Sequence, residues 1–551
     1  MTGDAASARF RELLDTYYRA WFRYHPEAAV DAGVAGYEHL LAPFLPEQRA
    51  PLVCLNDQLI CALDELDRSA LDDDSAMDCD VARAAAFLEN QRILDVDPHR
   101  PDPEALLPIN AIYQLTVRTV ADPAGAITAR LDAIPEHLRT AGIYLADSAA
   151  RVPVLWARSA VTAARAGVGL LQALPAHPAL QGCAQNFASI LAKAIRALQE
   201  FADIVERDVI PGARGDVACG PAYFVHLLRE RHFLDVSPDE LYRLGEQLVQ
   251  QTRRDLADAC RAVAGTTDLN AALQRLAGAH PAAERLLESY RASMQAARQF
   301  VIERTLVTPP ARERLDVIET PVFLRHQIPF AAYSEPSPTD PEQRGHYYVT
   351  PPVDAEQLAE HDEAGIMHTC VHEAWPGHHL QFVIANSRAS SRSLPRLLNA
   401  SATMYEGWAL YCEQLMHEQG FLQRPEQRII LLRDRLWRAL RVLIDVGLHT
   451  RGMSVEQAAD LLVDNLGFPR SQALADITWY TRSPTVPLSY ATGWALINAL
   501  RDRLRAQSPG LGLREFHDRL LSAGSIALPL VIRHAFGSER WDDVRRLLFG
   551  R

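Results

Sequence analysis

The stretch at residues 371–381 reads VHEAWPGHHLQ, with three histidines, a glutamate, a proline and a glycine packed into an otherwise helical sequence. A helix that only supports packing has no use for so many polar groups next to a helix-breaking proline. A hydrolytic metal site does need them, because imidazole nitrogens and carboxylate oxygens are the usual protein ligands of zinc. The stretch therefore predicts a metal site, and the surrounding chain is expected to complete it.

The first histidine and the glutamate follow the pattern of zinc-hydrolase helices. In those helices two histidines lie one turn apart, and the glutamate next to the first faces the attacking water. His372 and Glu373 fit this pattern, but Pro376 stands where the second histidine should be. Proline removes an amide donor and Gly377 relaxes the backbone, so a local bulge is expected to take up two residues and bring His378 to the ligand position.

Two further histidines compete with His378 as the second ligand. His379 returns to nearly the same helical face as His372, but two helical turns add a rise of about 10 Å, which disfavours chelation of one ion. His368 lies four residues before His372 and forms a plain HxxxH pair with it, and a supporting or core role is expected for it. His378 is preferred, and the other two stay open as alternatives.

Catalytic zinc sites usually have three protein ligands and one open position for water. The third ligand is expected in the helical stretch at 403–413, TMYEGWALYCE. Glu406 falls on an apolar face of this helix, where a carboxylate without a partner would be costly, so it is predicted to bind the metal. A structural salt bridge is the alternative. Glu413, two turns later, could orient a histidine, although a structural ion pair is the preferred interpretation.

Three side chains are candidates for stabilising the oxyanion of a hydrolytic transition state. Tyr480 and Tyr490 lie in residues 479–493, which read as a Pro-rich loop entering a helix, and His449 precedes them. Each of these residues taken alone is more often a packing or capping residue. Their occurrence in the same half of the chain as the metal motif favours a role in catalysis.

Composition places the chain among globular proteins with more than one domain. It has 551 residues, of which 48% are apolar and 23% are charged. The net charge of −13 argues against a nucleic-acid partner, which requires a basic surface. No run approaches the roughly 18 apolar residues of a membrane span, so no membrane partner is expected.

The cysteines and the N-terminus indicate a cytoplasmic protein. The eight cysteines are scattered, with no CxxC pair, which is typical of free thiols in a reducing compartment. The first residues include early acidic side chains and no apolar segment of the kind found in signal peptides. A cytoplasmic location is therefore expected.

The chain divides into two halves of different character. Residues 1–307 read as a helical scaffold, with apolar residues at three- and four-residue spacing and a possible sub-boundary near 210–221. Residues 308–551 form the metal-site half, whose helices carry both motifs. A small β element is expected near 317–350, where β-prone segments flank a Pro-rich loop at 334–345. This hairpin or sheet could form the edge of a cleft, and its strand edge could pair with an extended peptide.

Three motifs together resemble a bacterial family. HEAWPGHHLQ at 372–381, YEGWALYCEQ at 405–414 and PLSYATG at 487–493 are similar to the family catalogued as domain of unknown function 885, which is related to zinc-dependent metallopeptidases. The resemblance spans nearly the whole chain. It implies a mainly helical, zincin-like fold akin to thimet oligopeptidase and angiotensin-converting enzyme, with two helical halves around a deep cleft.

The resemblance also implies roles for single residues. His372, His378 and Glu406 match the ligand positions of the family, and Glu373 matches the general base. Many members resemble exported lipoproteins, whereas no such leader is recognised in this sequence, so a cytoplasmic location stays the expectation.

The sequence thus predicts a zinc-dependent hydrolase that cleaves an amide or peptide bond. Zinc would polarise the carbonyl and activate a water, and Glu373 would act as the general base and pass the proton to the leaving amine. One alternative is hydrolysis of a small non-peptide amide or amino-acid conjugate in a biosynthetic pathway. Another is a non-catalytic helical protein that binds zinc. Manganese, cobalt or iron could use the same ligands.

Overall fold

The computed structural model describes residues 3–182, 186–276, 280–325, 328, 330–507 and 510–550. Over these residues the protein is mainly helical, with 24 α-helices and three short strands, which confirms the expected fold class at that level. None of the helices in the described ranges is both long and apolar enough to cross a membrane.

The chain forms two compact units. The first comprises Met1–Val217, Thr320–Pro329 and Ser337–Thr339, and the second comprises Ala218–Glu319, Phe330–Pro336 and Asp340–Arg551. The division therefore follows residue 217, inside the 210–221 stretch, and differs from the predicted boundary at 307/308. The reason is that α10 (Pro238–Ala264) packs on α18 (Pro425–Thr450) and α12 (Leu286–Glu303) packs on α14 (Glu363–Glu373), so these earlier helices belong to the second unit.

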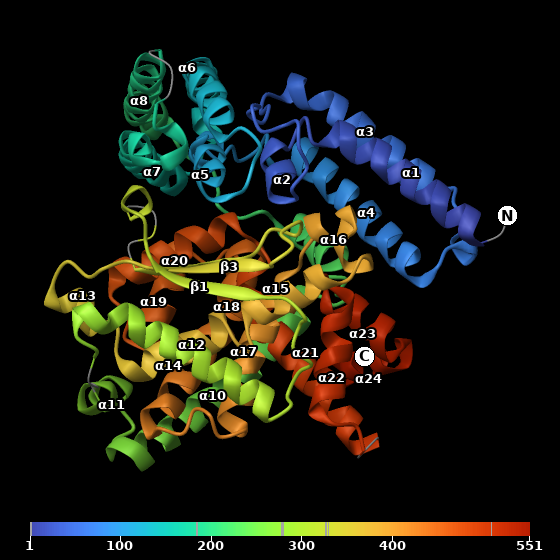
Figure 1. Cartoon of the computed structure of the whole chain (residues 1–551), viewed down its shortest axis with the longest axis vertical. Helices are drawn as coiled ribbons and strands as arrows, with labels where there is room; N and C mark the ends of the chain where they lie inside the picture. The colour runs from blue at the N-terminus through green and yellow to red at the C-terminus, as the bar shows by residue number, and fades with distance from the viewer. Residues whose placement is uncertain are drawn as a thin grey trace. The chain divides into compact units, whose positions relative to one another are not determined.

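The first unit is a set of packed helices in which α1, α3 and α4 (blue in Figure 1) lie side by side. A second group, α6 to α8, buries Ile127, Leu131, Ile134 and Leu138 from one face of α6 against Leu198 and Phe201 of α8. This spacing of three and four residues is the expected apolar stripe of a packed helix. The helices are α1 (Gly3–Trp21), α2 (Pro26–Asp31), α3 (Pro46–Asp64), α4 (Asp73–Gln91), α5 (Ile109–Val117), α6 (Pro123–Asp147), α7 (Val154–Ala173) and α8 (Phe187–Ile204).

The second unit holds every residue that the sequence predicts for the site. Its centre is formed by α10, α14, α17, α18 and α21, which pack on one another. Its helices are α9 (Pro221–His226), α10 (Pro238–Ala264), α11 (Leu269–Leu276), α12 (Leu286–Glu303), α13 (Ala355–Ala359), α14 (Glu363–Glu373), α15 (His378–Ser387), α16 (Leu394–Leu398), α17 (Ala402–Glu418), α18 (Pro425–Thr450), α19 (Val455–Leu466), α20 (Arg470–Arg482), α21 (Val486–Gln507), α22 (Leu513–Leu520), α23 (Leu528–Phe536) and α24 (Ser538–Phe549).

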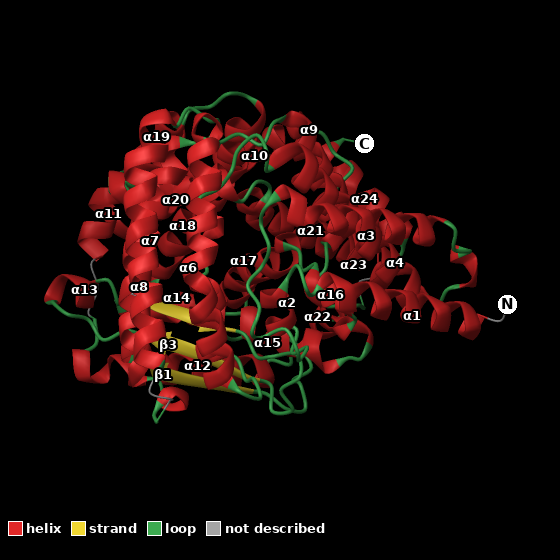
Figure 2. Cartoon of the chain, turned by 90° about the horizontal axis from the view of Figure 1, so that it is seen from above, coloured by secondary structure: helices red, strands yellow, loops and turns green. Residues whose placement is uncertain are grey.

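A three-stranded sheet lies in the second unit (yellow in Figure 2). β1 (Arg314–Glu319) is parallel to the central strand β3 (Arg344–Val349), and β2 (Ala331–Ser334) is antiparallel to β3. The predicted β element is therefore present as a sheet, but its two predicted segments, in β1 and β3, pair in parallel, and the hairpin around the Pro-rich loop is formed by β2, which was not predicted, with β3. Residues 322–324 form a 3₁₀ turn rather than a strand. Pro321 starts this turn, and its carbonyl accepts a hydrogen bond from the Leu324 amide at 2.8 Å.

The close packing of α17 against α21 depends on two glycines. A Cβ atom on Gly407 would lie 2.6 Å from the Cα atom of Gly493, and one on Gly493 would lie 2.1 Å from the carbonyl oxygen of Thr403. Any larger side chain would push the two helices apart. The contact places Tyr490, about one turn before Gly493, against the helix that carries Glu406.

The predicted Pro-rich loop at 479–493 is largely helical in the structure. α20 runs to Arg482 and α21 begins at Val486, so only a short turn separates them. Pro487 is the second residue of α21, where the missing amide hydrogen has no helical partner to lose. Asp445 on α18 accepts hydrogen bonds from the amides of Thr485 (3.2 Å) and Leu488 (3.1 Å), and so fixes the start of α21.

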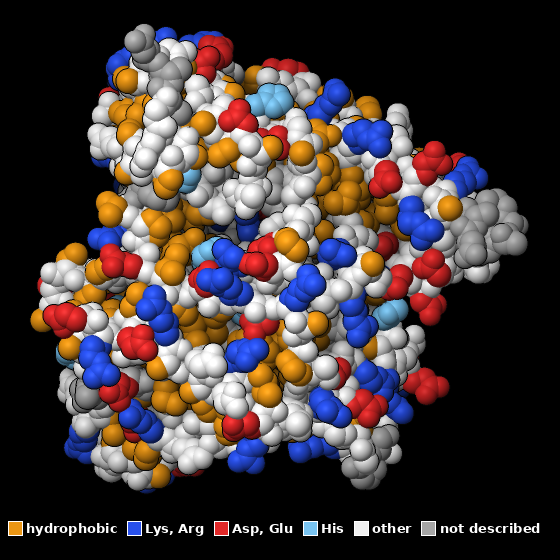
Figure 3. All heavy atoms as spheres, in the orientation of Figure 1, with side chains coloured by type: hydrophobic (Ala, Val, Ile, Leu, Met, Phe, Trp, Pro, Cys, Tyr) orange, Lys and Arg blue, Asp and Glu red, His pale blue; other side chains and the backbone are white. Residues whose placement is uncertain are grey.

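The surface carries both charge signs. On the face drawn in Figure 3, Lys and Arg side chains are interspersed with Asp and Glu rather than gathered into one basic patch. Such a mixed face presents no single strong electric field.

Candidate metal centre

The motif at 371–381 breaks one helix and starts another. α14 ends at Glu373 and α15 begins at His378. The amide of Gly377 donates to the carbonyl of Val371 (3.1 Å) and that of Leu380 to Ala374 (3.3 Å), six residues back rather than the usual four. The break thus takes up two residues, as predicted, although as a turn between two helices rather than as a bulge within one.

Gly377 is required by the close approach of the backbone in this turn. A Cβ atom there would lie 1.8 Å from the carbonyl oxygen of His372, far closer than a carbon and an oxygen can approach without a bond. From the other side, the indole of Trp408 on α17 donates from Nε1 to the carbonyl of Pro376 at 2.8 Å. The close approach at Gly377 and the hydrogen bond from Trp408 therefore fix the turn, and with it the direction in which α15 begins.

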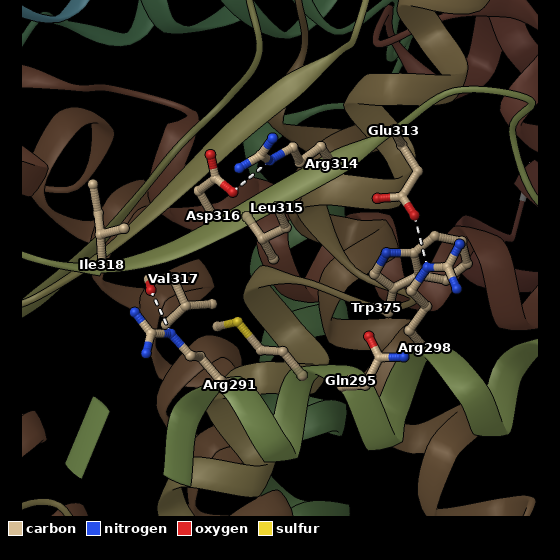
Figure 4. A pocket seen from close by; sticks show the side chains of 11 residues that line it. Arg291, Gln295, Arg298, Glu313, Arg314, Leu315, Asp316, Val317, Ile318 and Trp375 are labelled. Carbon is tan, nitrogen blue, oxygen red and sulfur yellow. Dashed lines mark hydrogen bonds and ion pairs between the residues drawn. The ribbon is translucent and has the colours of Figure 1, made fainter. Parts of the chain in front are cut away.

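Trp375 anchors the same turn in the core. It is 1% exposed, and the guanidinium of Arg298 lies 5.2 Å from its ring centroid. Figure 4 shows Trp375 at the side of a cavity of about 660 Å³ between α12 and β1, with Arg298 bonded to Glu313. Through Trp375, the turn therefore lies against α12 and β1.

His372, His378 and Glu406 come together at one point. One ligand atom from each side chain lies within 4.8 Å of the other two. Nε2 of His372 is 3.6 Å and Nε2 of His378 is 3.5 Å from Oε2 of Glu406. The two imidazole rings lie 4.8 Å apart and are perpendicular. The helices α14, α15 and α17 each supply one of the three predicted ligands.

The electrostatics of the cluster are those of a buried carboxylate between two imidazoles. Burial alone would raise the pKa of Glu406, but His378 and His372 outweigh burial and hold this pKa well below its usual range. Burial would likewise lower the pKa of His372, yet the neighbouring carboxylates of Glu406 and Glu413 raise it to about 10. Glu406 is therefore ionised between the two imidazoles.

Glu413 orients His372, which corrects the preferred interpretation of Glu413 as a purely structural ion pair. Nδ1 of His372 donates to Oε1 of Glu413 at 2.7 Å, which turns Nε2 towards Glu406. The other oxygen of Glu413 lies 3.1 Å from Nε2 of His368, and Asp434 follows at 3.6 Å from the same nitrogen. His368 thus lies behind the cluster and outside the set of three ligands.

His379 points away from the cluster. Its Nε2 lies 3.0 Å from Oε2 of Glu313, and its Nδ1 lies 3.2 Å from the hydroxyl of Tyr333. Both nitrogens are engaged and the side chain is 0% exposed. The structure therefore brings His378, and not His379, to the other two ligands.

Glu373 and Tyr490 flank the cluster. Glu373 is half-buried, follows His372 directly, and has no hydrogen-bond or ion-pair partner within the part of the chain that the structure describes. Tyr490 lies beside Glu406, and burial followed by the charge of Glu406 raises the pKa of its hydroxyl well above the usual range. Tyr490 therefore stays protonated and can donate.

Tyr480 and His449 lie elsewhere, which corrects their predicted role as oxyanion donors. The Tyr480 hydroxyl accepts from Trp437 Nε1 (3.1 Å) and Arg441 Nε (2.8 Å) and is fully buried. His449 Nδ1 accepts from the amide of Cys219 (3.2 Å), and its Nε2 lies 3.2 Å from the carbonyl oxygen of Tyr480. His449 thus has both ring nitrogens engaged in structural contacts, and the Tyr480 hydroxyl is buried against two donors, where no substrate can reach it.

Three residues that the sequence did not single out shape the site: Trp408, Glu313 and Arg441. Trp408 could have been noticed, because it stands two residues after Glu406 in the same motif. The Arg441 guanidinium lies 4.6 Å from the Tyr490 ring and also binds Tyr480, so it connects the two tyrosines. Glu313 and Arg441 lie far from the motifs in sequence and offered no local signal.

Two solved structures resemble this chain over nearly its whole length. A protein of Shewanella oneidensis, described as a "putative lipoprotein of unknown function", has a TM-score of 0.76 at 20% identity and covers 95% of this chain and 98% of its own. A "putative lipoprotein" of Colwellia psychrerythraea has a TM-score of 0.78 at 19% identity and covers 99% of this chain and 100% of its own. At such identity the likeness shows a shared fold. No curated protein matches the chain.

The expected cytoplasmic location is wrong by this comparison, since both solved structures are described as "putative lipoprotein". The cysteine pattern could not decide the compartment. Seven cysteines in the described ranges are free, and four of them (Cys79, Cys260, Cys370 and Cys412) are buried, while Cys183 lies outside those ranges. A buried thiol has no partner to reach in either compartment, so its reduced state identifies neither.

The family comparison bears on the whole chain. Residues 26–534 match the family described as "Bacterial protein of unknown function (DUF885)". The match includes all three motifs from which the resemblance was predicted, and it extends over both compact units. The chain therefore belongs to this bacterial family of unknown function, DUF885.

Proposed function

We propose that this protein is a zinc-dependent hydrolase that cleaves an amide or peptide bond. The observation that carries the proposal is the cluster of His372, His378 and Glu406, with ligand atoms within 4.8 Å of one another. Two imidazoles and one carboxylate form an established ligand set of catalytic zinc. A helix with His372 and Glu373 that faces a second helix with Glu406 also fits a zincin-like hydrolase.

The spacing of each imidazole nitrogen from the Glu406 oxygen fits a tetrahedral ion. Two ligands that each lie about 2.0–2.2 Å from zinc are about 3.4 Å apart in tetrahedral geometry. The Nε2 atoms of His372 and His378 lie 3.6 and 3.5 Å from Oε2 of Glu406, which is longer than a hydrogen bond. This oxygen is buried and has no hydrogen-bond partner among the described residues. A buried carboxylate oxygen without a donor is costly, and a cation would remove that cost.

The chemistry follows from the groups beside the cluster. Zinc held by these residues would supply a Lewis acid for the amide carbonyl and the attacking water. Glu373 accepts the proton of that water and returns it to the leaving amine, a role for which its unengaged carboxylate is suited. Tyr490 donates its hydroxyl hydrogen to the oxyanion that forms when the carbonyl is attacked.

The number of ligands favours catalysis over a structural role for the metal. Structural zinc sites are closed by four protein ligands, whereas catalytic sites keep one position for water or substrate. Within the described ranges, the group of possible ligands consists of three residues. A hydrolase therefore accounts for the cluster better than a protein that binds zinc only for stability.

The experiment combines metal analysis with one isosteric substitution. The purified protein is expected to hold about one zinc per chain, and its hydrolysis of a mixed peptide library, followed by mass spectrometry, is expected to stop after dialysis against a chelator. Glu373→Gln is expected to keep zinc and to lose at least about 10²-fold in rate, since it removes the general base. Glu363→Gln is the matched control, because Glu363 begins the same helix and its side chain is 47% exposed. Full activity of Glu373→Gln, or of the metal-free protein, would overturn the proposal.

A further inference from the structure

Three aromatic side chains form a row beside His378. They are Tyr333 on β2, Phe382 on α15 and Tyr405 on α17, and each is partly exposed. The Phe382 ring lies 6.5 Å from that of Tyr333 and 6.1 Å from that of Tyr405. The His378 ring lies 6.0 Å from Phe382 and 6.3 Å from Tyr405. All four spacings fall within the contact range of aromatic pairs, so the rings form a continuous surface that ends at the metal cluster.

The elements that carry the metal ligands also carry this row. Phe382 lies four residues after His378, which places both side chains on the same face of α15. Tyr405 directly precedes Glu406 on α17. Tyr333 is held by the hydrogen bond between its hydroxyl and Nδ1 of His379 at 3.2 Å. The row is thus fixed to the cluster through both ligand-bearing helices and is organised before any ligand arrives.

The row differs from the packing aromatics of the same helix. Trp408 and Tyr411 on α17 are 0% exposed, and both are hydrogen-bonded in the core. Tyr405, on the same helix, keeps part of its ring exposed, and its hydroxyl has no hydrogen-bond partner among the described residues. Partly exposed rings grouped next to a polar cluster are typical of a surface that binds an apolar group.

We infer that the row of Tyr333, Phe382 and Tyr405 is a substrate subsite that selects an aromatic or large aliphatic side chain next to the cleaved amide bond. This inference rests on the proposed hydrolase function. A flat apolar side chain can stack on Phe382 at the aromatic spacing found within the row, and it removes the exposed ring surface from water. A substrate with glycine at this position would leave the three rings exposed to water. In apolar pockets, a difference of this kind between two substrates changes affinity by about tenfold or more.

The test uses two metal-binding probes that differ only in the side chain. Phenylalanine hydroxamate and glycine hydroxamate share one chelating group, so calorimetric titration of the zinc-loaded protein isolates the effect of the benzyl group. The phenylalanine probe is expected to bind at least about tenfold more tightly. Phe382→Ala is expected to abolish this preference at unchanged zinc content, and Phe382→Leu to keep most of it. The control is Phe300→Ala, since Phe300 is a partly exposed ring on α12 that pairs with Phe421 at 5.2 Å.

Each other outcome overturns a defined claim. Equal binding of both probes by the wild-type protein overturns the subsite and leaves the hydrolase proposal standing. Loss of zinc in Phe382→Ala with equal weakening of both probes shows that the ring only supports His378, which also overturns the subsite. Failure of the zinc-loaded wild-type protein to bind either probe contradicts an open hydrolytic metal site, and the subsite falls with it. The wild-type comparison needs no variant, and Tyr405→Leu gives a second test if Phe382→Ala does not fold.

Discussion

Replacement of Glu413 tests whether the cluster is held in place by the residues behind it. The carboxylate is 1% exposed and has contacts of 2.7 Å to Nδ1 of His372 and 3.1 Å to Nε2 of His368. Glu413→Ala leaves both histidines buried and facing a void. Removal of one partner of a buried charged pair costs about 3–5 kcal/mol, so the loss of the hydrogen bond to His372 and of the ion pair with His368 predicts a destabilisation of this size in the metal-free protein.

The effect on zinc affinity follows from the orientation of His372. Without Glu413 its ring is free to turn, and loss of such a carboxylate partner weakens metal binding by about 10–100-fold. That range corresponds to about 1.4–2.8 kcal/mol. Glu413→Gln keeps an oxygen that can accept from Nδ1 of His372 but removes the charge, so its effect is expected near the lower end.

Two measurements check these values. Competition with a chromophoric chelator gives the zinc affinity, and urea unfolding followed by circular dichroism gives the stability. Glu456→Ala is the control, because its ion pair with Arg470 on the surface has side chains that are 68% and 41% exposed, and its loss is expected to change stability by less than about 1 kcal/mol. A folded Glu413→Ala protein with wild-type zinc affinity would refute the reasoning that Glu413 holds His372.

Three further variants probe separate parts of the site. Gly377→Ala places a Cβ 1.8 Å from a carbonyl oxygen, so urea unfolding is expected to show a loss of about 3 kcal/mol or more, and wild-type stability would contradict the tight turn. With any substrate found in the library, Tyr490→Phe is expected to lower kcat by about 10²–10³-fold at unchanged stability, whereas Tyr480→Phe leaves two buried donors unpaired and is expected to lower stability by about 1–3 kcal/mol instead. Burial lowers the pKa of His517 to about 4. Because an unfolded histidine has a pKa of about 6.5, the unfolded chain binds more protons between these values, so stability is expected to fall as pH drops from about 6.5 to 4. His517→Gln is expected to flatten that pH dependence, and an unchanged slope would contradict it.

The ligand set could be predicted because its information is local. His372, His378 and Glu406 all fall within residues 372–406, on α14, α15 and α17, and the residue types and the apolar surroundings of Glu406 carry the signal. The remaining choice, between His378 and His379, could not be made from the stretch itself. It is settled by Glu313, which lies 66 residues before His379 and fixes its ring. Only the fold brings that carboxylate into range.

The errors around Tyr480 and His449 have a common physical origin. Prolines at 484 and 487 made residues 479–493 read as a loop, although a proline near the start of a helix is tolerated. With α20 and α21 in their observed positions, Tyr480 is turned towards Trp437 and Arg441 in the core. A tyrosine with two structural donors and one with a catalytic role look the same in a sequence, because the difference depends on what the hydroxyl contacts.

The motif at 405–414 holds the motif at 372–381 in position. Glu406 supplies a ligand, Trp408 binds the carbonyl of Pro376, and Glu413 binds His372, so a single helix contacts both sides of the break. Because α17 is held close to α21 by Gly407 and Gly493, it cannot shift to follow a displaced turn. The positions of His372 and His378 are therefore set by α17 as much as by their own helices. An insertion of two residues between the histidines would scatter the ligands in a free helix, and here it is tolerated because a neighbouring helix fixes both ends of the interruption.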